Sequence, residues 1–351
     1  MSEWKETEYG KMPITWSLRK VNDIKGVDRR SMAMGPFGSN IKAENFVEKG
    51  VPVIRGTNMN YYKNVGGKFV YLTEEKADEL IGSNCKAGDL VFTHRGTIGQ
   101  VALIPSGKFD RYVISQSGMK LTVNPEIINN EFLFYFFKSE YGQHPILKNE
   151  AQVGVPSISN PLTSLKQIEV HVPSLLEQTA IASILSSLDD KIDLLHRQNK
   201  TLEQLAETLF RQWFVEEVEE SWARSEIGKV LKTELGGTPS TIIPEYWDGN
   251  IPWINSGEIN KFRIIEPTRC ITQLGLEKSN TKLLPIGTTV IAITGATLGQ
   301  ISLLEIEACA NQSVVGIIPT NEIPSEFVFL WVKHKLVGII ANVDIPGKLT
   351  T

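Results

Sequence analysis

The two halves of this 351-residue chain place short apolar runs and turn residues in a similar order. Each half has an apolar run with a proline and a polar tip, then a second run behind a glycine turn, then an aromatic-rich segment. Such patterns predict two short buried strands and a helix whose rings belong to the core. The predicted strands are Val51–Ile54, 88–93, 251–254 and 287–292, and the predicted helices are Asn130–Lys138 and 325–335. This order predicts a mixed α/β (α+β) fold for each half.

Short motifs extend the similarity into an internal repeat. The paired blocks are 4–11 with 222–229, 51–60 with 251–260, 97–100 with 297–300, 116–117 with 312–313, and 131–134 with 326–329. Chance similarity would not keep this order through five blocks, and the period is that of a domain. The alternative is a duplicated scaffold whose tips have no function. Because the strands agree while the tips differ, we favour two modules that bind two different targets.

The apolar stretch at residues 283–304 is long enough to cross a membrane as a helix, and it carries no charge. It contains a proline and three glycines, and its copy at 86–104 carries four charged or titratable residues. We therefore predict two buried strands joined by a turn. The N-terminal residues are polar and do not form a signal peptide, so a cytoplasmic location is expected.

After Pro173-Ser174 the chain contains no proline or glycine until about Val218. Pro173-Ser174 is a plausible helix start. Its apolar positions recur at alternating steps of four and three, which is the heptad pattern of a helix that packs on another helix. The predicted helix-packing residues, called the seam below, are Ile181, Leu185, Leu188, Ile192, Leu195, Asn199, Leu202, Leu209 and Trp213. Asn199 is the polar position that would fix register. The alternative is a helix that lies on the chain's own modules.

These features divide the chain into residues 1–172, a helical spacer at 173–220, and residues 221–351. The net charge is −4, and residues 171–220 carry 10 Asp/Glu against 4 Lys/Arg. The acidity is therefore concentrated in the predicted helix. The modules are close to neutral, whereas a non-specific nucleic-acid binder is usually more basic.

Several enzyme classes lack support in the sequence. The three cysteines are far apart and the five histidines are scattered, so neither a zinc site nor a disulfide framework is indicated. No glycine-rich phosphate loop occurs, and Asn160-Pro161 is followed by Leu162-Thr163 rather than by the Pro-aromatic pair of an adenine methyltransferase. A nuclease or methyltransferase is one alternative, and a structural adaptor that assembles partners through its helix is another.

Three groups of residues resemble a known family. Gly35-Pro36-Phe37-Gly38-Ser39-Asn40 followed by 51–56 resembles the opening of a target recognition domain in type I restriction-modification specificity subunits, and 236–240 with 247–254 resembles its other common opening. The most specific match is 172–178 with 181–182 and 188–193, which is similar to the conserved helical region of these subunits. The resemblance covers essentially the whole chain.

The resemblance implies a non-catalytic subunit. Each module would read one half of a bipartite double-stranded DNA sequence, and the helix would set their spacing and dock two modification (methyltransferase) subunits. Restriction (endonuclease/translocase) subunits would join that core. No cofactor is expected in this chain; S-adenosylmethionine, ATP and Mg are expected on the partner subunits.

In the family a second helix follows the second module and packs against the first. Here 346–351 follow the second aromatic segment closely, so a C-terminal truncation is expected, either natural or by cutting. The seam would then pair with that of a second copy in a self-dimer. An unstable or inactive fragment is the alternative.

Side chains that recognise DNA bases need paired hydrogen-bond donors or acceptors, and they must lie on exposed tips. Arg is suited to guanine, Asn to adenine, and Glu to the cytosine amino group. Ser39 and Lys42 are expected at phosphates, whereas Gln116 and Gln312 recur in both copies and fit a framework role equally well. The predicted DNA-binding residues are Ser39, Lys42, Arg55, Asn58, Arg95, Gln116, Asn255, Glu258, Thr294 and Gln312. For Arg55 and Arg95 the alternative is a surface ion pair.

Overall fold

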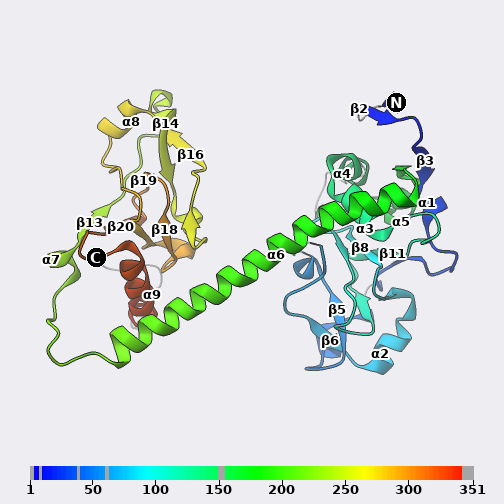
Figure 1. Cartoon of the computed structure of the whole chain (residues 1–351), viewed down its shortest axis with the longest axis horizontal. Coiled ribbons are helices and arrows are strands. Elements are labelled where there is room, and N and C mark those ends of the chain that lie inside the picture. Colours follow the sequence, from blue (N-terminus) through cyan, green and yellow to red (C-terminus); the bar gives the residue numbers. More distant parts are fainter. Residues whose placement is uncertain (1–3, 8–9, 38–39, 60–62, 149–154, 342–351) are drawn as a thin grey trace. The chain divides into compact units, whose positions relative to one another are not determined.

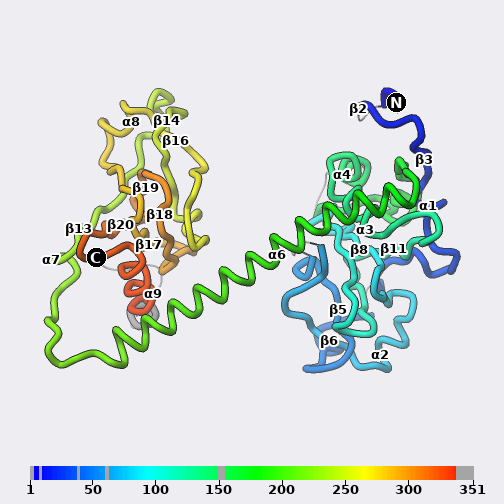
Figure 2. The backbone as a smooth tube through the Cα atoms, viewed as in Figure 1, coloured from blue at the N-terminus to red at the C-terminus, as the bar shows by residue number. Residues whose placement is uncertain are grey.

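The computed structural model describes residues 4–7, 10–37, 40–59, 63–148 and 155–341 (Figures 1 and 2). The chain forms two compact units, Met1–Gln198 and Asn199–Thr351, and the boundary falls inside the long helix α6 (Leu175–Arg211). Each unit mixes strands and helices, so the predicted fold class, two mixed α/β domains joined by a long helix, is confirmed.

Unit 1 contains a sheet of order β6-β5-β10-β7 and another of order β4-β11-β8-β9. The pairs β1–β2 and β3–β12 lie outside these sheets. Its strands are β1 (Trp4–Thr7), β2 (Gly10–Pro13), β3 (Ser17–Lys20), β4 (Met32–Met34), β5 (Val51–Ile54), β6 (Val70–Leu72), β7 (Asn84–Cys85), β8 (Leu90–Thr93), β9 (Val101–Leu103), β10 (Tyr112–Ile114), β11 (Gly118–Leu121) and β12 (Glu169–Val172). Its helices, apart from α6, are α1 (Val21–Ile24), η2 (Ala43–Asn45), η3 (Gly56–Asn58), α2 (Glu74–Glu79), η4 (Ile81–Ser83), α3 (Asn130–Lys138), α4 (Glu140–Leu147) and α5 (Pro161–Gln167).

Unit 2 repeats this plan with a sheet of order β16-β14-β19 and another of order β13-β20-β17-β18-β15. Its strands are β13 (Lys232–Leu235), β14 (Trp247–Ile254), β15 (Arg263–Ile264), β16 (Arg269–Ile271), β17 (Thr289–Ala292), β18 (Ile301–Leu304), β19 (Cys309–Ala310) and β20 (Val314–Ile318). The helical segments after α6 are the π turn η5 (Gln212–Glu216), α7 (Ile227–Val230), η6 (Pro244–Tyr246), η7 (Ser256–Glu258), α8 (Gln273–Glu277), η8 (Gly295–Thr297) and α9 (Ser325–Ala341).

The strand pairings confirm the internal repeat. The parallel pair β5–β10 has its counterpart in β14–β19, and the antiparallel run β4-β11-β8-β9 has its counterpart in β13-β20-β17-β18. Every strand and helix predicted from the repeat is present, although some ends differ by a few residues. The apolar stretch at 283–304 forms β17 and β18, which pair with each other. Within the described residues no helix is long and apolar enough to cross a membrane.

The first block of the repeat was wrongly aligned. Residues 4–7 and 10–13 form the hairpin β1–β2, whereas α7 begins within the supposed partner block. In the structure α7 precedes β13 as α1 precedes β4, so Trp222 corresponds to Trp16 rather than to Trp4. Tryptophan and a Gly-Lys pair recur in both places by chance, and only the strand order shows which match is structural.

The core of unit 1 lies between the sheet containing β8 and the helix α3. Phe92 of β8 packs edge-on against Phe137 of α3, with ring centroids 4.9 Å apart. Phe132, Phe134 and Phe137 are all buried, which confirms that the aromatic residues of α3 belong to the core. In unit 2, Val328, Phe329 and Val332 of α9 are buried in the same way.

The helix α6 begins next to Ser174, as predicted, and the structure shows a capping box there. The Ser174 hydroxyl accepts from the Glu177 N–H at 3.3 Å, and the Glu177 carboxylate accepts from the Ser174 N–H at 3.1 Å. The next turn is fixed to unit 1 by Gln178, which is fully buried. Its side-chain oxygen accepts from Asn129 N at 2.7 Å, and its nitrogen donates to Ile127 O and Pro173 O. The helical motif therefore contains a residue that joins α6 to the module before it.

Candidate nucleic-acid interface

Four loops of unit 1 meet where β5, β8 and β10 end and β11 begins. They are residues 35–37, 55–58, 94–100 and 115–117, and we call them the loop edge of unit 1. The Ser115 N–H donates to Ile54 O, and the His94 N–H donates to Ser117 O, each at 2.9 Å. Strand order therefore brings together segments that are up to eighty residues apart in the sequence.

The glycine at the start of the first loop is required by a close contact. A Cβ atom on Gly35 would lie 1.8 Å from the carbonyl oxygen of Ser115, and one on Gly236 would lie 2.1 Å from that of Asn311. Both glycine N–H groups donate to the first residue of a strand: Gly35 to Gly118 O of β11, and Gly236 to Val314 O of β20, each at 2.9 Å. The two different openings recognised in the sequence thus share one physical requirement.

His94 joins two of these loops. Its Nε2 lies 3.1 Å from the carbonyl oxygen of Gln116, and because a carbonyl can only accept, Nε2 carries the proton. Burial lowers the pKa of His94 below its ordinary value, and the nearby charge of Arg95 acts in the same direction. The neutral ring therefore holds the 115–117 loop near neutral pH.

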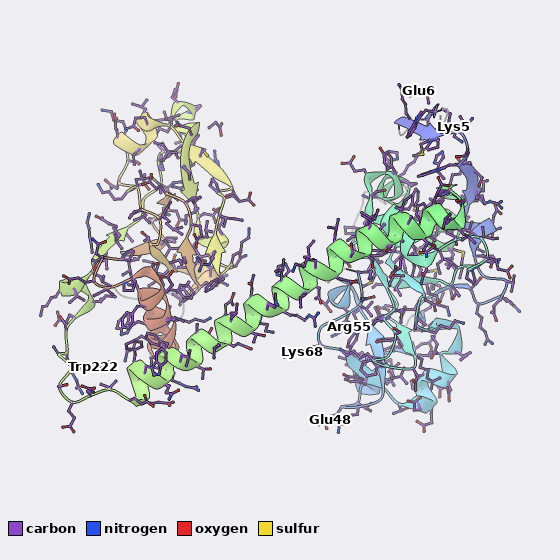
Figure 3. The ribbon with its side chains drawn as sticks, in the orientation of Figure 1. Lys5, Glu6, Glu48, Arg55, Lys68 and Trp222 are labelled. Carbon is purple, nitrogen blue, oxygen red and sulfur yellow. The ribbon has the colours of Figure 1, made fainter. Side chains whose placement is uncertain are left out.

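Arg55 and Arg95 lie on the loop edge and are exposed, as predicted. Figure 3 shows Arg55 on the periphery of unit 1. Neither guanidinium forms an ion pair with any residue that the structure describes, so the predicted alternative of a surface ion pair is not observed there. Both cations remain available to an anionic or acceptor-rich partner.

Asn58 is not suited to the base-reading role that its sequence position predicted. It is 1 % exposed, and its side-chain oxygen accepts from the Arg55 N–H at 3.0 Å. Its side-chain nitrogen donates to Gly66 O and Lys68 O, both at 2.9 Å. With both amide protons used and the group buried, Asn58 is a framework residue.

Glu258 has the same framework role in unit 2. One carboxylate oxygen accepts from the Asn255 N–H at 2.7 Å and the other from the Thr268 N–H at 3.0 Å. The neighbouring Asn255 accepts from Gly257 N at 2.7 Å through its side-chain oxygen. Its side-chain nitrogen donates to none of the described residues, so Asn255 keeps a donor for a partner.

The other predicted residues occupy varied positions. Lys42 is exposed and pairs with Glu44 at 3.5 Å, Thr294 is half-buried at the start of η8, and Ser39 lies outside the described residues. The recurrent glutamines differ, although both are exposed: Gln312 accepts a hydrogen bond from the Thr238 hydroxyl, whereas the Gln116 side chain bonds to none of the residues described. Their recurrence thus reflects a shared backbone position rather than a shared contact.

His94 and Thr238 were missed by the sequence reasoning. The residue that corresponds to His94 in unit 2 is Ile293, whose N–H makes the same bond to Ser313 O at 2.9 Å. Because the two side chains differ, recurrence gave no signal. Thr238 belongs to a motif that was singled out, but its partner lies 74 residues later.

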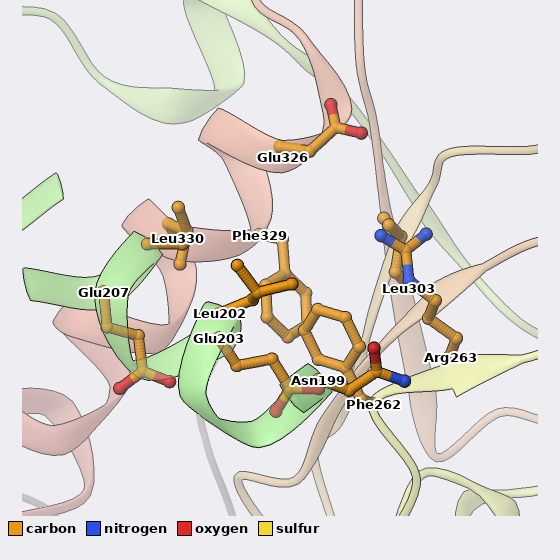
Figure 4. Close-up of a pocket in the computed structure, with 11 residues that line it drawn as sticks. Asn199, Leu202, Glu203, Glu207, Phe262, Arg263, Leu303, Glu326, Phe329 and Leu330 are labelled. Carbon is orange, nitrogen blue, oxygen red and sulfur yellow. The ribbon is translucent and has the colours of Figure 1, made fainter. Parts of the chain in front are cut away.

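The seam of α6 is largely exposed within the described residues. Leu188 is 57 % exposed and Leu202 is 61 % exposed, while Ile181 packs on the core of unit 1 and Leu209 is half-buried. Within unit 2, Asn199 and Leu202 open into a pocket of about 340 Å³ (Figure 4). Phe262 and Phe329 pack edge-on at its wall with centroids 4.9 Å apart. Exposed apolar helix positions next to an apolar pocket suit a helical partner.

No group of three or more metal-ligating side chains occurs among the residues that the structure describes. Of the cysteines, Cys85 and Cys309 are buried, and burial raises the pKa of the Cys309 thiol to about 11. A thiol with a raised pKa is a poor nucleophile. The loop edge, with its exposed cations and hydrogen-bonding groups, is the strongest candidate site for binding.

Comparisons with known proteins agree with this architecture. A family model described as type I restriction modification DNA specificity domain matches residues 13–204 and again 219–343. The MjaIX specificity subunit of Methanocaldococcus jannaschii, a type I restriction enzyme subunit, is 24 % identical over 323 residues, covering 85 % of this chain and 71 % of that protein. The HindI specificity subunit of Haemophilus influenzae is 23 % identical over 372 residues and covers 80 % of each.

Among solved structures, the S subunit of a type I restriction-modification system from M. genitalium shares the fold, with a TM-score of 0.56 and 18 % identity over 95 % of this chain and 81 % of that one. The two family matches begin at 13 and 219, shortly before Trp16 and Trp222, in keeping with the corrected alignment of the repeat. This chain therefore belongs to the family of type I restriction-modification DNA specificity subunits.

Proposed function

We propose that this chain reads a bipartite DNA target, with one half-site bound by each unit. The observation that carries the proposal is a shared framework with different side chains at its surface. The backbone after β5 and β14 is held by the same cap, from Asn58 and from Glu258, yet Arg55 stands where the other unit has Asn255. Two copies of one scaffold with different side chains at the same position are suited to two different half-sites.

The side chains at these corresponding positions favour different bases. Arg55 and Arg95 give unit 1 donors that match guanine O6 and N7 or a phosphate. At the corresponding positions unit 2 has the uncharged Asn255 and Thr294, which suit adenine or a mixed contact. Phosphate contacts would then contribute more to binding by unit 1 than by unit 2.

We further propose that α6 docks the modification subunits, with restriction subunits joining that core. The exposed seam and the pocket at Asn199 and Leu202 support a helical partner. In this arrangement the chain itself is non-catalytic, and S-adenosylmethionine, ATP and Mg belong to the partner subunits. A second copy of this chain is the other helical partner that the seam would accept.

The test is methylation mapping by long-read sequencing in cells that express this chain with its cognate modification subunit. A bipartite asymmetric motif is expected if both units of one chain read DNA. A bipartite palindrome would mean that two copies pair and that one kind of unit reads. A soluble complex that leaves the genome unmethylated would contradict the proposed function, and it is the result expected of a structural adaptor.

The matched variants Arg55→Ala and Asn255→Ala should each change one half of the motif and leave the other half intact. Val27→Ala, at a position that is 94 % exposed and lies outside the loop edge, is the control and should leave both halves unchanged.

A further inference from the structure

The loop edge of unit 1 carries an exposed aromatic ring. Phe37 is 71 % exposed although it directly follows Gly35 and Pro36, which are both buried. The backbone before the ring is fixed, because the Gly35 N–H donates to Gly118 O at 2.9 Å. A single exposed ring is common on a protein surface, so its meaning here comes from the loop edge on which it lies.

Phe37 belongs to the same loop edge as the residues that we assign to DNA. The backbone of Gly35 lies against that of Ser115 and Gln116. The Ser115 N–H donates to the carbonyl oxygen of Ile54, the residue before Arg55. The carbonyl oxygen of Gln116 accepts from the ring of His94, the residue before Arg95. An aromatic ring cannot bind phosphate, but every base offers it a flat face for stacking. Arg55 and Arg95 form no ion pair within the described part of the chain and can attract phosphates. A ring on the same edge is therefore suited to stack on the bases that those phosphates join.

Unit 2 differs at the same position. The residue two places after Gly236 is Thr238, and its hydroxyl donates to the side chain of Gln312. In unit 1 the ring of Phe37 can make no such bond, and Gln116 is left without a partner among the described residues. Because unit 1 has Phe37 where unit 2 has Thr238, its loop edge carries an exposed ring. The side-chain amide of Gln116 on the same edge forms no hydrogen bond to the residues described.

We infer that Phe37 is a DNA-stacking residue that inserts at a base step of the half-site read by unit 1, next to Gln116. This inference rests on the proposed function and deepens it. Partial insertion unstacks the step and bends the duplex, and pyrimidine–purine steps such as TA and CA unstack most readily. The half-site of unit 1 should therefore contain or adjoin such a step, and the half-site of unit 2 need not.

The experiment uses the complex of this chain with its modification subunits and a duplex carrying the mapped target. 2-Aminopurine is placed at each adenine in turn, and its fluorescence reports unstacking. Apart from the adenines that the modification subunits methylate and flip out of the duplex, the wild-type complex should brighten the probe at one step in the half-site of unit 1. Phe37→Ala should abolish that signal and weaken binding about ten- to a hundredfold, whereas Phe37→Trp should retain both.

Salt dependence separates stacking from charge. Phe37→Ala should leave the slope of log affinity against log salt unchanged, because no phosphate contact is lost, whereas Arg55→Ala should lower it if Arg55 binds phosphate. Val27→Ala is the matched control, since Val27 is 94 % exposed and lies in the loop between α1 and β4, outside the loop edge. Thr238→Ala tests the equivalent position of unit 2 and should leave the probe signal in place.

Two results would overturn the inference while leaving the proposed function intact. In one, Phe37→Ala binds and unstacks DNA like the wild type. In the other, Phe37→Ala prevents assembly with the modification subunits, seen by size-exclusion chromatography, and the wild type gives no probe signal, so the ring contacts protein. Absence of sequence-specific binding by the wild-type complex would instead count against the proposed function itself.

Discussion

Asn58 and Glu258 perform the same task in the two units, although one is an amide and the other a carboxylate. Asn58 accepts from the N–H of Arg55 at 3.0 Å, and Glu258 accepts from the N–H of Asn255 at 2.7 Å. Each caps the short 3-10 helix that follows the central strand, and so fixes the direction in which the tip side chain three residues earlier leaves the backbone. The residue three places after each tip side chain thus belongs to the scaffold.

Asn58→Ala should destabilise unit 1 by about 2–4 kcal/mol, because it removes three hydrogen bonds made by a buried side chain. The measurement is unfolding in urea followed by intrinsic fluorescence. Asn45→Ala removes an equivalent but exposed cap on Lys42 and should cost only about 1 kcal/mol. If Asn58→Ala altered the methylated motif at unchanged stability, a reading role for Asn58 would be restored.

Arg55→Ala should leave stability nearly unchanged, because the side chain is exposed and forms no ion pair within the described part of the chain. Loss of a bidentate contact to guanine should cost about 1–3 kcal/mol in discrimination at one position of the half-site. Binding of duplexes that vary at each position, measured by fluorescence anisotropy, checks this. A uniform loss of affinity across all sequences would identify a phosphate contact instead.

The stability of unit 1 should decrease as the pH falls below about 6.5, the ordinary pKa of histidine. The pKa of His94 is lowered in the folded chain, so between the two values the unfolded state binds more protons and acid favours unfolding. His94→Gln, which keeps an N–H donor but does not titrate, should show a smaller loss of stability between pH 7.5 and 5.5.

Asp89 titrates in the opposite sense and serves as the comparison. Burial raises its pKa, so its contribution to stability is present below the ordinary value and is lost as the pH rises through the folded one. Asp89→Asn should therefore leave the His94-dependent part of the profile in place. Identical pH profiles for the wild type and His94→Gln would show that His94 is not the titrating group.

Charges on the seam should prevent assembly without unfolding the chain. Leu188 is 57 % exposed and Leu195 is 43 % exposed, so Leu188→Glu and Leu195→Glu remove little buried contact from the chain alone. Against a helical partner each would bury an unpaired carboxylate, which is strongly unfavourable. Sedimentation analysis with and without modification subunits should show loss of the complex at an unchanged melting temperature. Thr201→Glu, at an exposed position of α6 outside the seam, is the control.

Much of this organisation follows from local sequence. Strands such as Val51–Ile54 and the helix Asn130–Lys138 could be predicted because their apolar content and flanking turns are local properties. The start of α6 was predictable for the same reason, since Ser174 and Glu177 form its cap within a single turn. The duplication and the family could be recognised because order along the chain is itself sequence information.

The roles of the tip residues were decided by tertiary structure. Asn58 became a framework residue because loop closure brought the carbonyls of Gly66 and Lys68 to its amide, and Gln312 was tied by a threonine 74 residues away. His94 acquired its place through β11, which no local pattern links to β8. A polar side chain after a strand can either cap the backbone or face a partner. The local sequence determined that a polar tip would follow each strand. Only the packing of distant segments decided which side chains of that tip remained free to bind.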